Sequence, residues 1–189
     1  MQLHGKTIRL SQLFCLALYY GFAQYLPASY TLGGKVGKRI RYMLCKHIFK
    51  KCGKNVNVER RANFGAGTEI EIGDNSGLGV NCMIPNGTVI GNDVMMGENC
   101  FIIRHNHIHS RTDTPMNKQG FEPVKTVIIE DDVWIGRNVT IMPGLRIKKG
   151  TIIGTCCVLT KNFDEYSIVG GVPGKFLKSR VNDEDNSIT

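Results

Sequence analysis

Three histidines alternate along one short stretch of the chain, IIRHNHIHSRTD at residues 102–113. The imidazoles of His105, His107 and His109 can take up and return protons near neutral pH, because the unperturbed pKa of histidine is about 6.5. They can also bind a metal ion, since residues spaced two apart in an extended strand lie on one face. No further acid or cysteine completes such a metal site. The stretch thus offers a general base and, less completely, a metal site.

A repeat of six residues runs through the chain on both sides of these histidines. An aliphatic residue or methionine recurs at every sixth position in two blocks: Ile72, Leu78, Ile84, Ile90, Met96 and Ile102, then Ile129, Ile135, Ile141, Ile147, Ile153 and Leu159. This period matches neither the roughly 3.6 residues of a helix nor the alternation of a strand. It is typical of a solenoid, in which each short strand points one side chain into a shared core.

A long loop separates the two blocks. From Ile102 to Ile129 is 27 residues where the repeat requires six, so 21 extra residues leave the solenoid. We place this projecting loop at 104–124, where it carries all three histidines. Long excursions from a regular scaffold often hold functional residues. The functional site is therefore expected at this loop.

Residues 1–53 lack the repeat and have the pattern of two helices, separated by Pro27 and Gly33–Gly34. In the second helix, apolar residues are expected on one face, Lys and Arg elsewhere, and Gly53 at the C-cap. The expected apolar face consists of Val36, Ile40, Met43, Leu44 and Ile48.

The expected architecture is mainly β, in three parts. A helical segment (1–53) precedes the solenoid domain (54–174), and a basic C-terminal segment with an acidic tail (175–189) follows.

The positive charge is concentrated in the N-terminal segment. The net charge is +8, but residues 1–61 hold 12 Lys or Arg and one acid, Glu59. The basic helices can pack on the solenoid and help line an acceptor site, lie on an anionic membrane surface, or bind nucleic acid. Packing within the protein is the commonest of these fates. The apolar run at 13–26 favours membrane contact over nucleic acid, because no DNA- or RNA-reading motif or aromatic stacking platform occurs.

The cysteines and the apolar run indicate the compartment. The seven cysteines have no zinc-like spacing, and several replace apolar residues of the repeat, so we interpret them as small buried hydrophobic residues in a reducing compartment. The run at 13–26 is shorter than the roughly 20 residues that span a bilayer, and no signal-peptide cleavage pattern follows it. A cytoplasmic location is expected, with membrane contact limited to the periphery of the inner face.

The six-residue repeat resembles that of the hexapeptide-repeat acyltransferases. Within that family, the sequence is most similar to the maltose- and galactoside-type sugar O-acetyltransferases. The similarity covers about residues 54–178. Its most specific segments are RHNHIHSRTDTPMNKQGFEP (104–123), VIIEDDVWIGRNVTIMPGLRI (127–147), VLTKNF (158–163) and VGGVPGKFLK (169–178). More weakly, the N-terminal segment is similar to the helical lead-in of capsule or exopolysaccharide acetyltransferases.

The resemblance implies a left-handed parallel β-helix that assembles as a homotrimer, with acetyl-CoA in the groove between adjacent subunits. The implied reaction transfers an acetyl group to a sugar hydroxyl, of a surface polysaccharide or its precursor. The catalytic histidine of the family, in register from the repeat, corresponds to His107 as general base. The resemblance gives His105 and His109 no role and implies no metal.

The resemblance also assigns residues to the acyl donor. Trp134 corresponds to an aromatic residue near the acetyl group, and coils that include Gly136, Gly154 and Thr155 flank the pantetheine arm. Residues toward the nucleotide and its phosphates are Thr160, Lys161, Lys175, Lys178 and Arg180. Where the family has Ala-Gly-Ser, this chain has Thr155-Cys156-Cys157. Loss of the small glycine there is expected to crowd a backbone contact to the donor.

Several of these residues have ordinary structural alternatives. Trp134 can be rim packing, and the C-terminal basic residues can form a solvated face. Asp113 can orient a histidine or bind sugar hydroxyls, although a solvated loop carboxylate is the commoner role. Asn81 and Asn99 stand near the expected acceptor groove, at edges where turn-forming asparagine is common.

Three other functions fit parts of the sequence. The same fold can acetylate another acceptor, such as an amino sugar, serine or an antibiotic. The histidine triplet allows a metalloenzyme similar to the γ-class carbonic anhydrases. A scaffold that keeps the solenoid without activity is the third.

Overall fold

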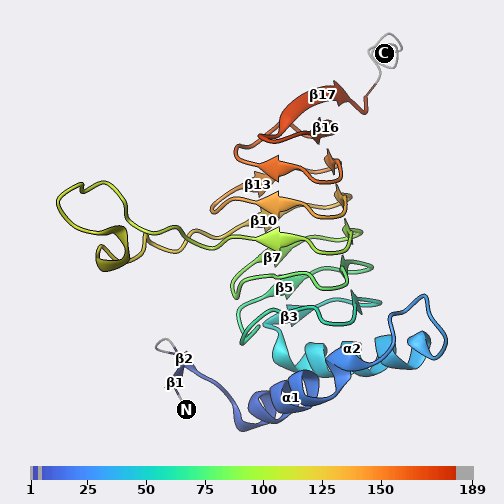
Figure 1. Ribbon diagram of the computed structural model, residues 1–189. Coiled ribbons are helices and arrows are strands. Elements are labelled where there is room, and N and C mark those ends of the chain that lie inside the picture. The colour runs from blue at the N-terminus through green and yellow to red at the C-terminus, as the bar shows by residue number, and fades with distance from the viewer. Residues whose placement is uncertain (1, 4–5, 182–189) are drawn as a thin grey trace.

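The computed structural model describes residues 2–3 and 6–181, with side chains from residue 8 onward (Figure 1). The N-terminal part consists of β1 (Gln2–Leu3), β2 (Lys6–Thr7), α1 (Leu10–Gly21), the 3-10 helix η1 (Ala23–Tyr25) and α2 (Gly34–Ile48). The two helices expected within residues 1–53 are confirmed. Residues 182–189, which hold the expected acidic tail, lie outside the described part.

Very short strands make up the body of the molecule. From β3 to β15 every strand has two residues: β3 (Lys51–Cys52), β4 (Asn57–Val58), β5 (Glu71–Ile72), β6 (Gly77–Leu78), β7 (Val89–Ile90), β8 (Met95–Met96), β9 (Phe101–Ile102), β10 (Ile128–Ile129), β11 (Trp134–Ile135), β12 (Thr140–Ile141), β13 (Arg146–Ile147), β14 (Ile152–Ile153) and β15 (Val158–Leu159). An antiparallel pair, β16 (Ser167–Gly170) and β17 (Lys175–Ser179), closes the C-terminal end.

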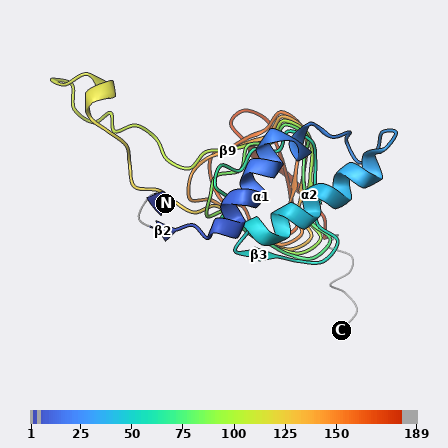
Figure 2. The ribbon, with the colours of Figure 1, turned by 90° about the horizontal axis from the view of Figure 1, so that it is seen from below.

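The register of the strands explains the six-residue repeat. Ile72 pairs in parallel with Ile90, so one coil holds 18 residues, or three repeats. Ile90 pairs with Ile129, a separation of 39 residues, which is one coil plus the 21 extra residues that the sequence indicates. The three strands of a coil belong to three different sheets, which form the sides of a prism (Figure 1, Figure 2). The expected mainly β solenoid is confirmed.

The repeat positions form the core of this prism. Eleven of the twelve side chains are buried, and Met96 is partly buried. Burying each aliphatic side chain contributes roughly 1.5–3 kcal/mol, so the stacked column dominates the stability of the solenoid. Buried polar residues two positions earlier are satisfied within the chain, as where the Ser76 hydroxyl donates to the Gly91 carbonyl at 2.6 Å.

Four of the seven cysteines are buried, as the interpretation from the sequence expects. Cys82, Cys100 and Cys157 are buried in the solenoid core, and Cys45 lies on the buried face of α2, whereas Cys15 and Cys52 are partly buried. Cys156 is exposed, because it occupies a corner position with a left-handed backbone (φ 61°) and its side chain leaves the core. For Cys156 the expectation of burial is wrong.

The loop between β9 and β10 projects far from the prism, as the yellow-green segment of Figure 1 shows. It contains the 3-10 helix η2 (Met116–Lys118). In the described part of the chain, no helix has the length and apolarity needed to cross a membrane.

Helices α1 and α2 lie across the N-terminal end of the solenoid (Figure 2). The expected apolar face of α2 is right only in part. Ile48 is buried and Ile40 and Leu44 pack against the core. Val36 and Met43 are exposed, and the buried face includes Arg41 and Cys45 instead. The helix also ends at Ile48, before the predicted Gly53.

The burial of Arg41 explains why the buried face of α2 differs from the predicted one. Its side chain is fully buried and donates hydrogen bonds to the carbonyls of Leu26, Pro27 and Val58, and it forms an ion pair with Glu59 at 3.5 Å. A guanidinium carries five donors in a fixed fork, so it can join backbone carbonyls of several segments at once. The charged residue, and not an apolar one, therefore fastens α2 to the solenoid.

Candidate active site

The projecting loop folds back on itself, and this holds His107 in a defined place. The Ile108 N–H donates to the Gly120 carbonyl at 3.1 Å, and the Glu122 N–H donates to the Asn106 carbonyl at 2.8 Å. His107 and Phe121 form an antiparallel bridge between the two limbs. The imidazole lies against the Phe121 ring with 4.2 Å between ring centroids. The histidine is exposed, but its backbone and one ring face are fixed.

The three histidines have three different environments. His105 meets the edge of the same Phe121 ring at 4.8 Å, and its Nδ1 atom is buried without a hydrogen-bond partner. His109 directs Nδ1 to the backbone carbonyl of His107 at 3.1 Å. Among the hydrogen bonds of the described residues, none engages a ring nitrogen of His107. No three His, Cys, Asp or Glu side chains within residues 8–181 are grouped as metal ligands.

Asp113 is engaged by its neighbours in the loop. Arg111 binds its carboxylate through two atoms, Nε at 2.9 Å and Nη2 at 2.6 Å, and Thr114 donates at 3.4 Å. The hydrogen bond from Arg111 lowers the pKa of Asp113 below its ordinary value. No hydrogen bond among the described residues joins Asp113 to a histidine, so the geometry gives it no orienting role there.

Several residues expected at the acyl donor meet at one corner of the prism. Trp134 on β11 is 51% exposed and stands in register between Met95 and Ile152. The chain turns at Gly136, and the coil stacked on it turns at Gly154 and Thr155. A Cβ at Gly136 would lie 2.7 Å from the Thr155 nitrogen, so these backbones touch and glycine is required there.

The departure from the family pattern lies at this corner. Gly154, which precedes the changed residues, is present as in the family pattern. A Cβ there would lie 3.3 Å from the Val169 carbonyl oxygen, which is a tight contact. Cys157 fills a core position, while Cys156 takes the left-handed turn and accepts a hydrogen bond from the Asn138 amide at 3.8 Å. The change places an exposed thiol next to Thr155.

The remaining expected donor residues lie elsewhere on the chain. Thr160 and Lys161 follow β15, which belongs to a different sheet from Trp134. Lys161 stands over the Phe163 ring at 5.4 Å. Lys175 and Lys178 are exposed on β17, which extends the sheet that contains Trp134.

Arg180 is already engaged within the chain. Its Nη1 atom donates to the Gly150 carbonyl at 2.7 Å and to Asp132 at 3.0 Å. A single chain thus places the expected donor residues on two separate corners.

Asn81 and Asn99 belong to a ladder of asparagines in the same stack of turns as Gly136 and Thr155, on the coils toward the N-terminal end. The Asn81 amide donates to Asn99 at 3.2 Å, and the Asn99 amide donates to Asn138 at 3.1 Å. All three have φ near 56° (56°, 57° and 55°), a conformation that asparagine tolerates well. Their amides join successive coils, which is a structural role.

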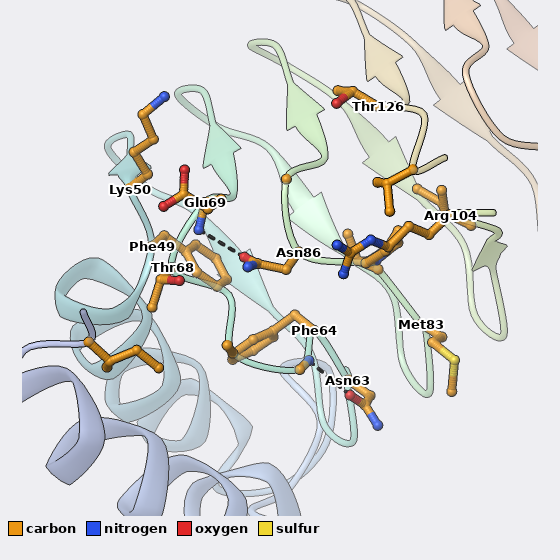
Figure 3. A pocket seen from close by; sticks show the side chains of 18 of the residues that line it. Phe49, Lys50, Asn63, Phe64, Thr68, Glu69, Met83, Asn86, Arg104 and Thr126 are labelled. Atoms are coloured by element: carbon orange, nitrogen blue, oxygen red, sulfur yellow. Dashed lines mark hydrogen bonds between the residues drawn. The ribbon is translucent and has the colours of Figure 1, made fainter. Parts of the chain in front are cut away.

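Sequence patterns missed a groove of about 1340 Å³ beside the foot of the loop. It lies between the N-terminal helices and the solenoid, and its lining comes from segments far apart in the chain: 8–9, 12, 46–47, 49–50, 63–66, 68–69, 83–87, 101–105, 124 and 126. Figure 3 shows Phe49, Phe64, Asn86 and Arg104 around it. The Arg104 Nε atom is buried without a partner. Two signals in the sequence pointed here: the position of Arg104 next to the histidines, and the expectation that the N-terminal helices can help line an acceptor site.

Comparison with known proteins identifies this arrangement. The family model described as bacterial transferase hexapeptide (six repeats) matches residues 126–161. A galactoside O-acetyltransferase of Lactococcus lactis is 32% identical over 146 residues, which cover 75% of this chain and 68% of that protein. WbbJ of Escherichia coli, named as a lipopolysaccharide biosynthesis O-acetyl transferase, is 33% identical over 95 residues, 47% of this chain and 48% of its own.

A solved structure of a galactoside acetyltransferase also resembles this chain in its fold. A galactoside acetyltransferase in complex with coenzyme A superposes with a TM-score of 0.73 and 26% identity, covering 93% of this chain and 83% of that one. The family and the enzyme class expected from the sequence are confirmed. The chain belongs to the hexapeptide-repeat acetyltransferases and resembles the galactoside O-acetyltransferases among them.

Proposed function

We propose that this chain transfers the acetyl group of acetyl-CoA to a hydroxyl group of a sugar, with His107 as general base. The observation that carries the proposal is the exposed imidazole of His107, whose ring nitrogens have no partner in the described protein while Phe121 fixes the ring. A base for catalysis needs a nitrogen that is free to meet the substrate and a ring that does not turn away.

The reaction needs proton transfer more than covalent help from the protein. His107 accepts the proton of the sugar hydroxyl as its oxygen attacks the thioester carbonyl carbon. The carbon–sulfur bond then breaks, and the imidazolium returns the proton to the departing thiolate, giving an acetyl ester and free coenzyme A. A backbone N–H near the carbonyl oxygen would stabilise the tetrahedral oxyanion.

The groove beside the loop is the proposed acceptor site. Arg104 and His105 line it and directly precede the segment that carries His107. The groove also has apolar walls from Phe49 and Phe64 and an amide from Asn86 (Figure 3). Sugar rings present apolar faces and hydroxyl edges, so such a mixed lining suits them. Asn81, Asn99 and Asp113 remain weaker candidates for the acceptor, because other protein groups already bind their side chains.

The division of the donor residues between two corners supports a homotrimer. Trp134, Gly136, Gly154 and Thr155 lie at one corner, while Thr160 and Lys161 lie at another. A neighbouring copy that brings its second corner to the first would complete one donor site between subunits. Lys175 and Lys178 then supply positive charge for the phosphates, as point charges.

The acceptor is proposed to belong to a surface polysaccharide or its precursor. The support is the similarity to WbbJ, which is named for lipopolysaccharide biosynthesis. The seven free cysteines fit a cytoplasmic site, where acetyl-CoA is available and thiols stay reduced.

Thiol release from acetyl-CoA tests the proposal. The purified protein is assayed with neutral and acidic sugars, oligosaccharides, serine and chloramphenicol, beside His107→Ala and the matched loop variant His109→Ala. We expect acetylation of at least one sugar, a loss of about a thousandfold or more in His107→Ala, and little change in His109→Ala. Equal release by wild type and His107→Ala with every acceptor would refute the role of His107. Preferential acetylation of serine or chloramphenicol would refute the proposal that the acceptor is a sugar.

A further inference from the structure

The N-terminal end of the solenoid has an outer surface that the proposed reaction does not use. One face of each terminal helix packs on the solenoid: Tyr19 of α1 donates to the Ala62 carbonyl at 2.8 Å, and Arg41 of α2 donates to the Val58 carbonyl. Both helices lie across the end of the prism (Figure 1, Figure 2). The opposite helix faces are therefore directed away from the solenoid.

These outward faces are apolar. The exposed apolar residues are Leu10, Phe14, Leu18, Phe22 and Tyr25 in and after α1, and Leu32, Val36 and Met43 before and within α2. Leu10 is 83% exposed, Phe14 65% and Leu32 99%. We call this set the basal surface. The end of a solenoid normally has a polar outer face that keeps it soluble, and an apolar patch marks an interaction site instead.

Cations without partners surround the basal surface. Arg9, Lys35, Lys38, Arg39 and Lys46 form none of the ion pairs found among the described residues. The other two basic residues of the helical region, Arg41 and Lys50, are paired with Glu59 and Glu71. No Asp or Glu occurs in the first 58 residues of the chain, so this segment supplies no carboxylate of its own to the surface.

We propose that the basal surface docks on an anionic lipid bilayer. The helices can lie in the plane of the interface, with Phe14, Leu10 and their neighbours entering the boundary between headgroups and acyl chains. The five cations then meet lipid phosphates. A second copy of the chain is a poorer partner, because two basal surfaces would bring their unpaired cations together.

Docking also has a consequence for the acceptor. Arg9 and Lys46 line the groove beside the loop as well as bordering the basal surface. The mouth of the groove would therefore lie near the lipid headgroups, where a sugar linked to a lipid can reach it. This consequence rests on the proposed function, whereas docking itself does not.

Co-sedimentation of the full chain with vesicles tests the docking. Vesicles of phosphatidylcholine alone are compared with vesicles that also contain phosphatidylglycerol. The variants are Leu10→Ser/Phe14→Ser and Lys35→Gln/Arg39→Gln. Their matched controls are Val172→Ser/Leu177→Ser, exposed at the other end of the solenoid, and Lys118→Gln/Lys149→Gln. Thermal unfolding followed by circular dichroism checks that each variant folds.

We expect the wild type to bind the anionic vesicles. The affinity should fall on the order of tenfold in either basal variant and stay unchanged in the control variants. Added salt should weaken it as well. Three results would overturn the proposal: no binding, equal binding to both kinds of vesicle, or basal variants that bind as the wild type does. Sedimentation velocity tests the alternative partner. If the wild type does not bind vesicles but self-associates, and the basal variants lose this self-association, the surface belongs to a second copy instead. Because no acceptor is present, these results do not depend on the acetylation assay.

Discussion

The rings of His107 and Phe121 lie 4.2 Å apart between centroids, on opposite limbs of the projecting loop. The same phenyl ring also meets His105 at 4.8 Å. One aromatic side chain therefore organises the histidine stretch, although nothing in the sequence near Phe121 indicates it. Its contact with His107 makes it a positioning residue for the proposed base.

Replacement of Phe121 by alanine should impair catalysis without unfolding the protein. We expect kcat/KM to fall by about tenfold to a hundredfold, because the imidazole loses its support and leaves the attack geometry. The loss should fall mainly on kcat, and Phe121→Tyr should restore most of the activity. Met116→Ala, also exposed in the loop, serves as the control. An unchanged kcat in Phe121→Ala would mean that the ring contact has no part in positioning His107.

Arg41→Met should destabilise the fold strongly. The change leaves Glu59 without its cation and removes hydrogen bonds from three carbonyls, for an expected loss of about 3 kcal/mol or more in the free energy of unfolding. Urea unfolding measures the loss, with exposed Arg39→Met as the matched control, expected to change little. Similar midpoints for the two variants would contradict the central role of Arg41.

The stability of the protein should depend on Glu59 at acid pH. Burial alone raises the pKa of Glu59, but hydrogen bonds from Ser29 and Asn57 and the charge of Arg41 outweigh it, so the pKa lies below the ordinary 4.5. A lowered carboxyl pKa stabilises the fold fully above the unfolded value and loses that contribution as the pH falls through the folded value. Urea midpoints measured from neutral pH to below 4.5 should therefore fall less steeply in Glu59→Gln than in wild type. If the urea midpoints of the two proteins fall in parallel with pH, Glu59 does not contribute to the acid sensitivity of the fold.

Gly136→Ala should disturb the corner proposed for the acyl donor. The new Cβ would lie 2.7 Å from the Thr155 nitrogen, so the stacked backbones must separate, at a cost of about 1–3 kcal/mol. Gly77→Ala is the matched control, because its nearest contact would be an ordinary 3.5 Å. Thermal unfolding compares the two. Equal stability would show that the coils at Gly136 can separate freely.

Cys156 should be the first thiol to react with a maleimide in the native protein. It is exposed, whereas burial raises the pKa of Cys100 to about 11 and that of Cys52 to about 11. Peptide mapping by mass spectrometry identifies the labelled residue, and Cys156→Ser should abolish the rapid phase. If Thr155 borders the donor as proposed, acetyl-CoA should slow the labelling. Labelling that acetyl-CoA does not change would place the donor away from this corner.

The sequence alone determined the solenoid. An Ile, Leu or Met at every sixth residue is satisfied if each coil of the chain stacks on the one below, and the pairing of Ile72 with Ile90, three repeats apart, agrees with that period. The separation of Ile90 and Ile129 likewise follows from the 21-residue insertion. Local spacing carries this information because every coil repeats the same contacts.

Only the tertiary structure decided which side chains of the helices and the loop meet. The apolar pattern of α2 predicted a buried face through Val36 and Met43, but carbonyls from two other segments and a carboxylate draw Arg41 inward instead. The groove joins residues from Ile8 to Thr126, and Phe121 reaches His107 through a fold in the loop. Such contacts depend on partners distant in the chain, so no local period records them.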